Sequence, residues 1–228
     1  MSRETTHPQW TVIEGDCLKV LPTLTGIDAV ITDPPYGMDA DTDSTRFSGG
    51  VFGRERYRVQ GKAWAPIAGD AEPFDPAPLL QYPKVVMFGC NHFAQRLPVG
   101  TTLVWIKRSD DLFGTFLSDA ELAWMKGGHG VYCFRKQFPP PSRAHEAGGR
   151  AAHPTQKPIG LMRWCLERAK VQPGELVVDP YCGSGTTGIA CVQMGIRFIG
   201  IELDPKHCQT ARRRIAEAAN HLFAGGAA

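Results

Sequence analysis

The sequence lacks three features that would assign it to a broad class at once: a long apolar run, paired cysteines and a strong charge of one sign. None of its apolar runs approaches the roughly 18 residues that span a bilayer, and residues 1–7 contain no apolar signal core. We therefore expect a cytoplasmic protein with no membrane partner. The net charge of +2 is too small to indicate a nucleic-acid partner by itself.

The seven cysteines include no CxxC pair. Cys90-Asn91-His92 and the stretch from His129 to Cys133 do not supply the four well-spaced ligands that a zinc site needs. We expect no metal, and we interpret the cysteines as small buried hydrophobic residues in a reducing compartment.

The 228 residues, of which 43% are hydrophobic, are enough for a full core in a single domain over residues 1–228. Short apolar runs alternate with helical segments, which favours an α/β fold with a parallel sheet. Strands are predicted near residues 10–13, 29–32, 85–88, 103–106 and 122–125, and residues 175–202 are predicted to form a strand, a glycine-rich turn, a helix and a further strand. Helices are predicted over residues 159–170 and from Pro205 onward, where Arg212-Arg213-Arg214 is interpreted as a solvated face.

Two stretches lack this rhythm. Residues 37–70 are long for a connection, and such loops are usually functional or mobile, so we expect a mobile loop that faces DNA. Residues 126–150 form a short candidate target-recognition segment. Both mix basic with aromatic residues, which suits phosphate contacts and base stacking, although ordinary solvated loops remain the alternative. The candidate DNA-binding residues are Arg46, Arg54, Arg56, Arg58, Lys62, Arg135, Lys136, Arg143 and Arg150.

A glycine-rich turn, Gly183-Ser184-Gly185-Thr186-Thr187-Gly188, follows the apolar run Leu176-Val177-Val178 and opens a helix. Glycines let the backbone approach a ligand, and an acid at the end of the next strand, Glu202, can accept both hydroxyls of a ribose. A dinucleotide is one candidate ligand. Only about 40 residues follow the turn, however, so the strands of a dinucleotide fold would have to come from the amino-terminal half. Asp179 could instead hold the amino group of S-adenosylmethionine.

Asp33-Pro34-Pro35-Tyr36 follows another apolar run, Ala29 to Thr32. The exocyclic nitrogen of adenine or cytosine is a poor nucleophile because its lone pair is delocalised into the ring. The Asp33 carboxylate and the Pro34 carbonyl could accept its two hydrogens, and the two prolines would fix that geometry. Tyr36 offers a face on which an extruded base can stack. The alternative is an ordinary β-turn.

These elements together resemble the S-adenosylmethionine-dependent DNA amino-methyltransferases of the β group, in which the catalytic motif precedes the cofactor motif. His153-Pro154-Thr155-Gln156-Lys157-Pro158 resembles the family's segment beside the methionine end of the cofactor, and Gly15-Asp16-Cys17 resembles its element near the adenine. The resemblance implies a Rossmann-like fold of circularly permuted motif order, with a seven-stranded, mostly parallel sheet containing one antiparallel strand.

The resemblance also implies the site residues. The catalytic residues would be Asp33, Pro34, Pro35 and Tyr36. The cofactor S-adenosyl-L-methionine would be held by Asp16, Cys17, Asp33, Thr155, Gln156, Lys157, Asp179, Pro180, Cys182, Gly183, Ser184, Gly185, Thr186, Thr187, Glu202 and Leu203. Lys157 could instead contact phosphate.

The implied reaction is methyl transfer to the N6 amino group of a flipped adenine in double-stranded DNA. Asp33 favours adenine because cytosine-amino enzymes of this family more often carry Ser there. N4-cytosine is the runner-up, followed by RNA or a protein glutamine amide, whose enzymes usually place the catalytic motif after the cofactor motif. A nucleic-acid-binding module without catalysis is the remaining class. A homodimer and a cognate restriction enzyme stay open as partners.

Overall fold

The computed structural model describes residues 9–38, 71–115, 118–139, 142, 145, 146 and 156–225. The chain divides into two compact units, one formed by Met1–Pro34 with Asp75–Ala228 and the other by Pro35–Phe74. The prediction of a single domain over residues 1–228 stays a prediction.

The first unit contains a sheet in which, over the described residues, seven strands follow the order β1-β7-β6-β2-β3-β5-β4. Its strands are β1 (Trp10–Glu14), β2 (Ala29–Thr32), β3 (Lys84–Phe88), β4 (Gly100–Ile106), β5 (Ala120–Arg135), β6 (Leu176–Asp179) and β7 (Arg197–Glu202). The central strands β2 and β6 are buried along their whole length, as both faces of a parallel sheet require. The predicted strands and the predicted α/β class are confirmed.

Strand β5 runs antiparallel to β3 and carries a reversal that the sequence did not predict. Its first half runs antiparallel to β4, with Ile106 opposite Ala120, whereas its second half runs parallel to β4, with Ile106 opposite Arg135. The chain turns at Gly127 and Gly128, whose φ angles of +82° and +67° favour glycine. Residues 126–135 of the candidate target-recognition segment (126–150) are therefore strand, and residues 131–135 lie along the outer side of β4.

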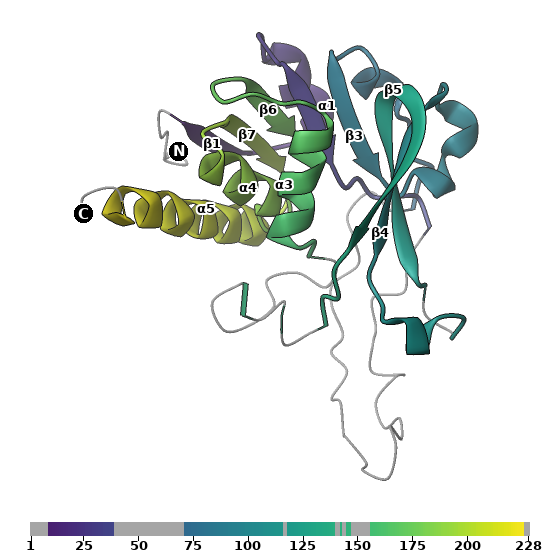
Figure 1. The fold of residues 1–228 in the computed structure, drawn as a ribbon. Coiled ribbons are helices and arrows are strands. Elements are labelled where there is room, and N and C mark those ends of the chain that lie inside the picture. Colours follow the sequence, from purple (N-terminus) through teal and green to yellow (C-terminus); the bar gives the residue numbers. More distant parts are fainter. Residues whose placement is uncertain are drawn as a thin grey trace. The chain divides into compact units, whose positions relative to one another are not determined.

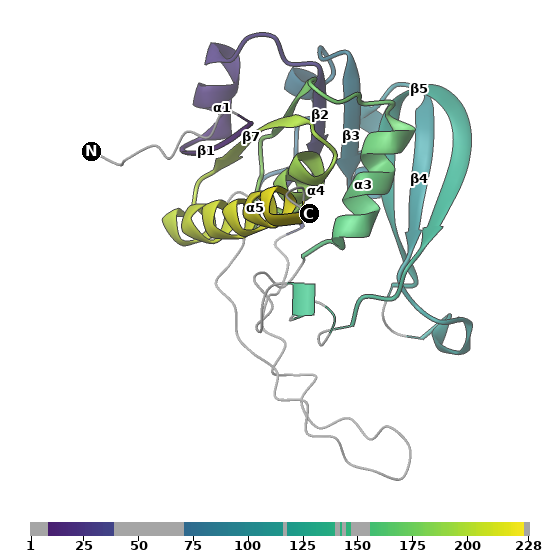
Figure 2. The same ribbon diagram turned by 60° about the vertical axis from the view of Figure 1, so that its left-hand side comes forward.

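Three helices lie side by side on one face of the sheet, with α4 between α3 and α5 (Figures 1 and 2). The helices are α1 (Cys17–Val20), α3 (Ile159–Arg168), α4 (Thr186–Gln193) and α5 (Pro205–Gly225). Short 3-10 helices occur at Leu21–Thr23, Ala77–Leu79, Cys90–His92, Ala94–Arg96 and Asp110–Leu112. The core contains five of the seven cysteines, all of them free thiols, whereas Cys17 is half-buried and Cys133 is exposed.

The carboxyl ends of the parallel strands meet at one edge of the sheet. Strand order reverses between β6 and β2, and open α/β sheets bind ligands in the crevice at such a point. Because β5 is antiparallel to β3, its first residues lie at that same edge, as does the end of β4. The fold thus gathers the ends of strands that lie far apart in the sequence.

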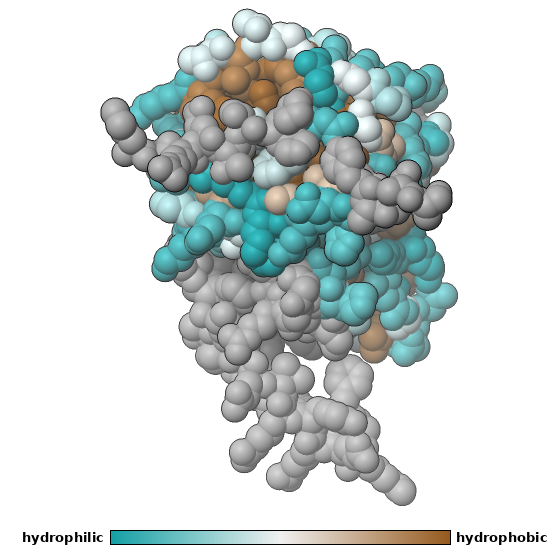
Figure 3. Space-filling view, turned by 90° about the vertical axis from the view of Figure 1, so that its left-hand side faces the viewer, coloured by the Kyte–Doolittle hydropathy of each residue, from teal (hydrophilic) through white to brown (hydrophobic). Residues whose placement is uncertain are grey.

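Seen from the side of β1, the surface carries a hydrophobic area surrounded by hydrophilic residues (Figure 3). Over the described ranges, no helix is long and apolar enough to cross a membrane.

Candidate active site

A direct hydrogen bond joins the carboxyl ends of β2 and β6. The Thr32 hydroxyl, at the end of β2, donates to Asp179 Oδ1 at 2.7 Å, although the two residues are 147 positions apart. Asp179 Oδ2 accepts from the Thr187 hydroxyl at 2.7 Å, and the Tyr181 amide donates to Oδ1 at 3.1 Å. The carboxylate of Asp179 therefore joins the acceptor strand, the glycine-rich turn and the start of α4.

Asp179 is 3% exposed, and burial raises its pKa to about 6 against the three hydrogen bonds that lower it. A carboxylate offers about four acceptor positions, of which three are occupied by this chain. The predicted contact with a cofactor amino group stays a prediction, and the geometry assigns Asp179 a structural task as well.

The glycine-rich turn is shaped by backbone conformation and by one acid. Gly185 has a φ of +81° and forms the N-cap of α4, and a Cβ there would lie 3.0 Å from Ala211. Glu202, at the end of β7, accepts from the Gly183 amide at 2.8 Å and from the Asp204 amide at 2.9 Å. Glu202 therefore holds the turn, with acceptor positions left for the predicted ribose contact.

Arg214 of α5 is a site residue that sequence reasoning missed, and interpreting residues 212–214 as a solvated face was wrong for it. Its side chain is 3% exposed and donates to the Ser184 carbonyl at 2.6 Å and to the Ser184 hydroxyl at 3.0 Å. Burial lowers its pKa to about 10. Arg212 donates to the Val12 carbonyl at 2.8 Å, and Arg213 alone matches the expectation, in an exposed pair with Glu217. No signal in the sequence singles out the buried arginine, because three consecutive arginines look alike before the packing of α5 is known.

The loop after β1 meets the loop after β7, where the Gly15 amide donates to the Glu202 carbonyl at 2.9 Å. Asp16 caps α1 by accepting from the Leu18 amide at 3.0 Å, as predicted. The half-buried Cys17 thiol is hydrogen-bonded to Tyr181, and burial raises its pKa. Leu18 and Leu203 expose 67% and 57% of their surfaces, so these two loops present apolar side chains beside carboxylates.

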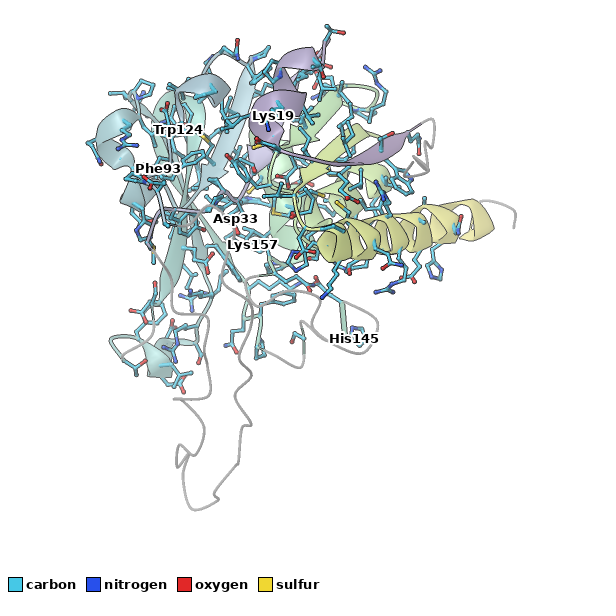
Figure 4. The ribbon with its side chains drawn as sticks, turned by 180° about the vertical axis from the view of Figure 1, so that it is seen from behind. Lys19, Asp33, Phe93, Trp124, His145 and Lys157 are labelled. Carbon is cyan, nitrogen blue, oxygen red and sulfur yellow. The ribbon has the colours of Figure 1, made fainter. Side chains whose placement is uncertain are left out.

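At the end of β2, Asp33 contacts Lys157, which precedes α3. The Lys157 ammonium forms an ion pair with Asp33 Oδ2 and a second one, at 3.1 Å, with Glu121 Oε2. Figure 4 shows the labelled Asp33 and Lys157 side chains next to each other. Glu121, at the start of β5, also pairs with Lys107 at 3.0 Å. The sequence placed Lys157 beside a cofactor or a phosphate, whereas its ammonium lies between two carboxylates.

The other predicted site residues divide into three groups. Pro180, Cys182, Ser184, Thr186, Thr187 and Gln156 lie in the glycine-rich turn, in α4 or before α3 in the first unit, whereas Pro35 and Tyr36 begin the second unit. Arg135 pairs with Asp110 at 2.5 Å and Lys136 with Glu146 at 3.2 Å. The predictions for Arg46, Arg54, Arg56, Arg58, Lys62, Arg143, Arg150 and Thr155 fall outside the described residues.

Solved structures with the same fold are DNA methyltransferases. The complex of M1.HpyAVI with SAM has a TM-score of 0.53 at 20% identity, covering 90% of this chain and 99% of that one. The cytosine-N4-specific PvuII DNA methyltransferase has a TM-score of 0.55 at 15% identity, covering 95% of this chain and 93% of that one. At these identities the likeness establishes the Rossmann-like methyltransferase fold alone.

Sequence comparison supplies the family. Residues 81–213, more than half of the chain, match the DNA methylase family of N6 and N4 type. The chain belongs to this family, the S-adenosylmethionine-dependent DNA amino-methyltransferases. The putative methylase YubD of Escherichia coli K12 is 28% identical over 94% of each chain. The DNA adenine methyltransferase YhdJ of the same organism is 32% identical over 48% of this chain and 42% of its own length.

The residues on the cofactor side fit S-adenosyl-L-methionine. An adenosine needs apolar walls and acceptors for its hydroxyls, which Leu18, Leu203 and Glu202 present on two neighbouring loops. At Gly183 the turn leaves the backbone open to close approach, as an amino-acid end requires, because a Cβ there would meet nothing nearer than 4.0 Å, whereas Gly185 packs against Ala211. Within the described parts of the chain, His, Cys, Asp and Glu side chains form no group able to hold a metal ion.

Proposed function

We propose that this chain methylates the exocyclic N6 amino group of adenine in double-stranded DNA by direct transfer from S-adenosyl-L-methionine. The observation that carries the proposal is the adjacency of the two motifs at one sheet edge. Thr32, next to the acceptor residue Asp33, bonds to Asp179, which opens the cofactor motif. The acceptor amine and the methyl donor would therefore meet in one crevice.

On the cofactor side, Glu202 and Asp16 would take the adenosine hydroxyls and base edge, with Leu18 and Leu203 against the ring. The turn Tyr181 to Gly185 would receive the amino-acid end. When bound, S-adenosyl-L-methionine supplies an electrophilic methyl group. Arg214 keeps the turn in shape from behind, because it holds the Ser184 carbonyl and hydroxyl.

On the acceptor side, Asp33 and the Pro34 carbonyl would accept the two hydrogens of the target amine. Drawing both hydrogens aside localises the nitrogen lone pair toward the incoming methyl carbon. After methyl transfer, the amine would give up one proton, which a carboxylate of the site or water would accept. Tyr36 would stack on the extruded base, a contact of about 1–3 kcal/mol.

Adenine is favoured over cytosine by the acid at position 33 and by the relative YhdJ, a DNA adenine methyltransferase. N4-cytosine is the second candidate, since it demands the same geometry at its amine and the PvuII enzyme has the same fold. Arg135 and Lys136 would contact DNA phosphates from the end of β5. A homodimer and a restriction partner remain predictions.

The test is to incubate the purified protein with unmethylated DNA and labelled S-adenosyl-L-methionine, digest the DNA to nucleosides and identify the product by mass. N6-methyladenine is expected. N4-methylcytosine would overturn the choice of adenine but keep direct transfer to an amine. Absence of both bases, with cofactor binding intact, would contradict DNA as the substrate. An Asp33→Ala preparation controls for methyltransferases carried over from the expression host.

A further inference from the structure

Lys157 occupies an unusual position for a lysine of a nucleic-acid enzyme. Its side chain is 6% exposed, and its ammonium lies between the carboxylates of Asp33 and Glu121. The ring of Phe88, the last residue of β3, lies 5.2 Å from the ammonium and closes a third side. The predicted contact of Lys157 with phosphate stays a prediction, whereas these three contacts place its ammonium beside the acceptor residue Asp33.

The two carboxylates and two ammonium groups form a chain of alternating sign. Lys107 follows β4, Glu121 opens β5, Lys157 precedes α3 and Asp33 follows β2, so four elements meet through these charges. The formal charges sum to zero, which limits the cost of holding them away from water. Burial opposes the ionisation of Glu121, but the ammonium groups of Lys157 and Lys107 lower its pKa to about 2. Glu121 is therefore a charged anchor for Lys157 at neutral pH.

We infer that Lys157 is a positioning residue for methyl transfer, which fixes the Asp33 carboxylate in the orientation that meets the target amine. This inference rests on the proposed function. Lys157 contacts Asp33 through Oδ2, while the Asp33 side chain stays 23% exposed, so a substrate amine can reach it. Glu121 pairs with the same ammonium, which restricts the movement of Lys157.

A positioning role separates Lys157 from the cofactor-binding role that its motif suggests. It contacts the acceptor residue Asp33, Glu121 of β5 and Phe88 of β3, and neither Glu121 nor Phe88 is a cofactor candidate. Cys165 of α3 is also close enough to sense its charge, but burial raises the pKa of that thiol, which stays uncharged. Removing Lys157 should therefore slow the chemical step and spare cofactor affinity.

The experiment compares Lys157→Met with Lys107→Met. Both variants remove one ammonium group that pairs with Glu121 and keep an unbranched side chain of nearly the same length. Of the two lysines, only Lys157 also pairs with Asp33. Misplacement of a reacting group by about 1 Å costs on the order of 10²-fold. We expect a loss in kcat of about that size for Lys157→Met and less than about threefold for Lys107→Met, with the cofactor Kd of both within about threefold of wild type. Lys157→Arg should recover part of the loss.

Cofactor affinity that falls in parallel with kcat, or a kcat for Lys157→Met equal to that of Lys107→Met, would overturn the inference. If Lys157→Met does not give a cooperative thermal melt, Glu121→Gln tests the same link, since it frees Lys157 to move and should lower kcat without weakening cofactor binding. An inactive wild type contradicts the proposed function instead. Crystal structures then decide the inference, because an unchanged Asp33 orientation in Lys157→Met refutes it whatever the activity.

Discussion

The cofactor side and the acceptor side of this crevice are held in place by different kinds of interaction. The glycine-rich turn is fixed by short hydrogen bonds: Thr187 donates to Asp179, the Gly183 amide donates to Glu202, and Arg214 donates to the Ser184 carbonyl. Glu202 and Arg214 belong to other elements, β7 and α5. Asp33 is fixed by charge, through Lys157 and the anchor Glu121. A backbone scaffold suits a ligand that must be enclosed, whereas an ion pair can aim one carboxylate at a substrate that comes and goes. Variants on the acceptor side should therefore lower kcat, and variants on the cofactor side should weaken cofactor binding.

The largest effect is expected on the acceptor side. Asp33→Ala should lower kcat by about 10³-fold or more, because a positioned acid–base group contributes roughly 10²–10⁴-fold. Cofactor affinity should stay within about threefold of the wild-type value, since Asp33 lies on the acceptor side, where it pairs with Lys157. Titration calorimetry and the nucleoside assay measure the two quantities. A large loss of cofactor affinity in this variant would show that Asp33 serves both the cofactor side and the acceptor side.

The two sides should respond to pH in opposite directions. Burial raises the pKa of Asp179 from 3.8 to about 6, so the folded state holds a proton that the unfolded state has lost, and the free energy of unfolding falls as pH rises across this window. Two pKa units correspond to about 3 kcal/mol. Glu121, whose pKa is lowered from 4.5 to about 2, instead contributes stability above pH 4.5 that is lost as pH falls toward 2.

Urea unfolding between pH 2.5 and pH 7 checks this difference in wild type, Asp179→Asn and Glu121→Gln, and the loss of stability below pH 4.5 should be smaller in Glu121→Gln than in wild type. The wild-type loss of stability between pH 4 and pH 6 should disappear in Asp179→Asn and persist in Glu121→Gln. Parallel curves for wild type and Asp179→Asn would show that Asp179 does not titrate as its burial implies.

Arg214 and Arg213 provide a matched pair for the cofactor side. Arg214→Met leaves the Ser184 carbonyl buried without its donor, which should cost about 1–3 kcal/mol and weaken cofactor binding. Arg213→Met loses an exposed pair at helical spacing, worth about 0.3–0.5 kcal/mol. Thermal melts with and without S-adenosyl-L-methionine measure both effects. Equal losses in the two variants would remove Arg214 from the site.

A small effect on stability is also expected at Arg135. Its side chain is 53% exposed and its pair with Asp110 lies at the surface, so Arg135→Ala should change the free energy of unfolding by less than about 1 kcal/mol. If Arg135 contacts phosphate, the slope of log K against log salt should fall by about one unit. DNA titrations at several salt concentrations measure it, with Arg213→Ala as an exposed control. An unchanged slope would remove Arg135 from the DNA-binding set.

Sequence reasoning succeeded where one local pattern determines the outcome. The apolar runs gave every strand of the sheet, Asp16 and Pro205 marked helix starts, and the glycines marked the turn before α4. It could not distinguish Arg214 from Arg213, because burial depends on how α5 packs against the turn. The partner of Lys157 was equally hidden, since Asp33 lies 124 positions away and Glu121 acts from an antiparallel strand. The reversal of β5 at Gly127 depends on strand pairing, which spacing does not encode.

The sheet order has a consequence for how the protein is made. β2 lies between β3, the next strand along the chain, and β6, whereas β1 pairs with β7, with Trp10 opposite Phe198. β2 can therefore pair with β3 early, but the sheet is complete only once β6 and β7 have been synthesised. Pairing across such separations also slows folding. The acceptor motif at the end of β2 and the cofactor motif at the end of β6 are thus brought together by a highly non-local strand pairing, and the site forms only when that pairing does.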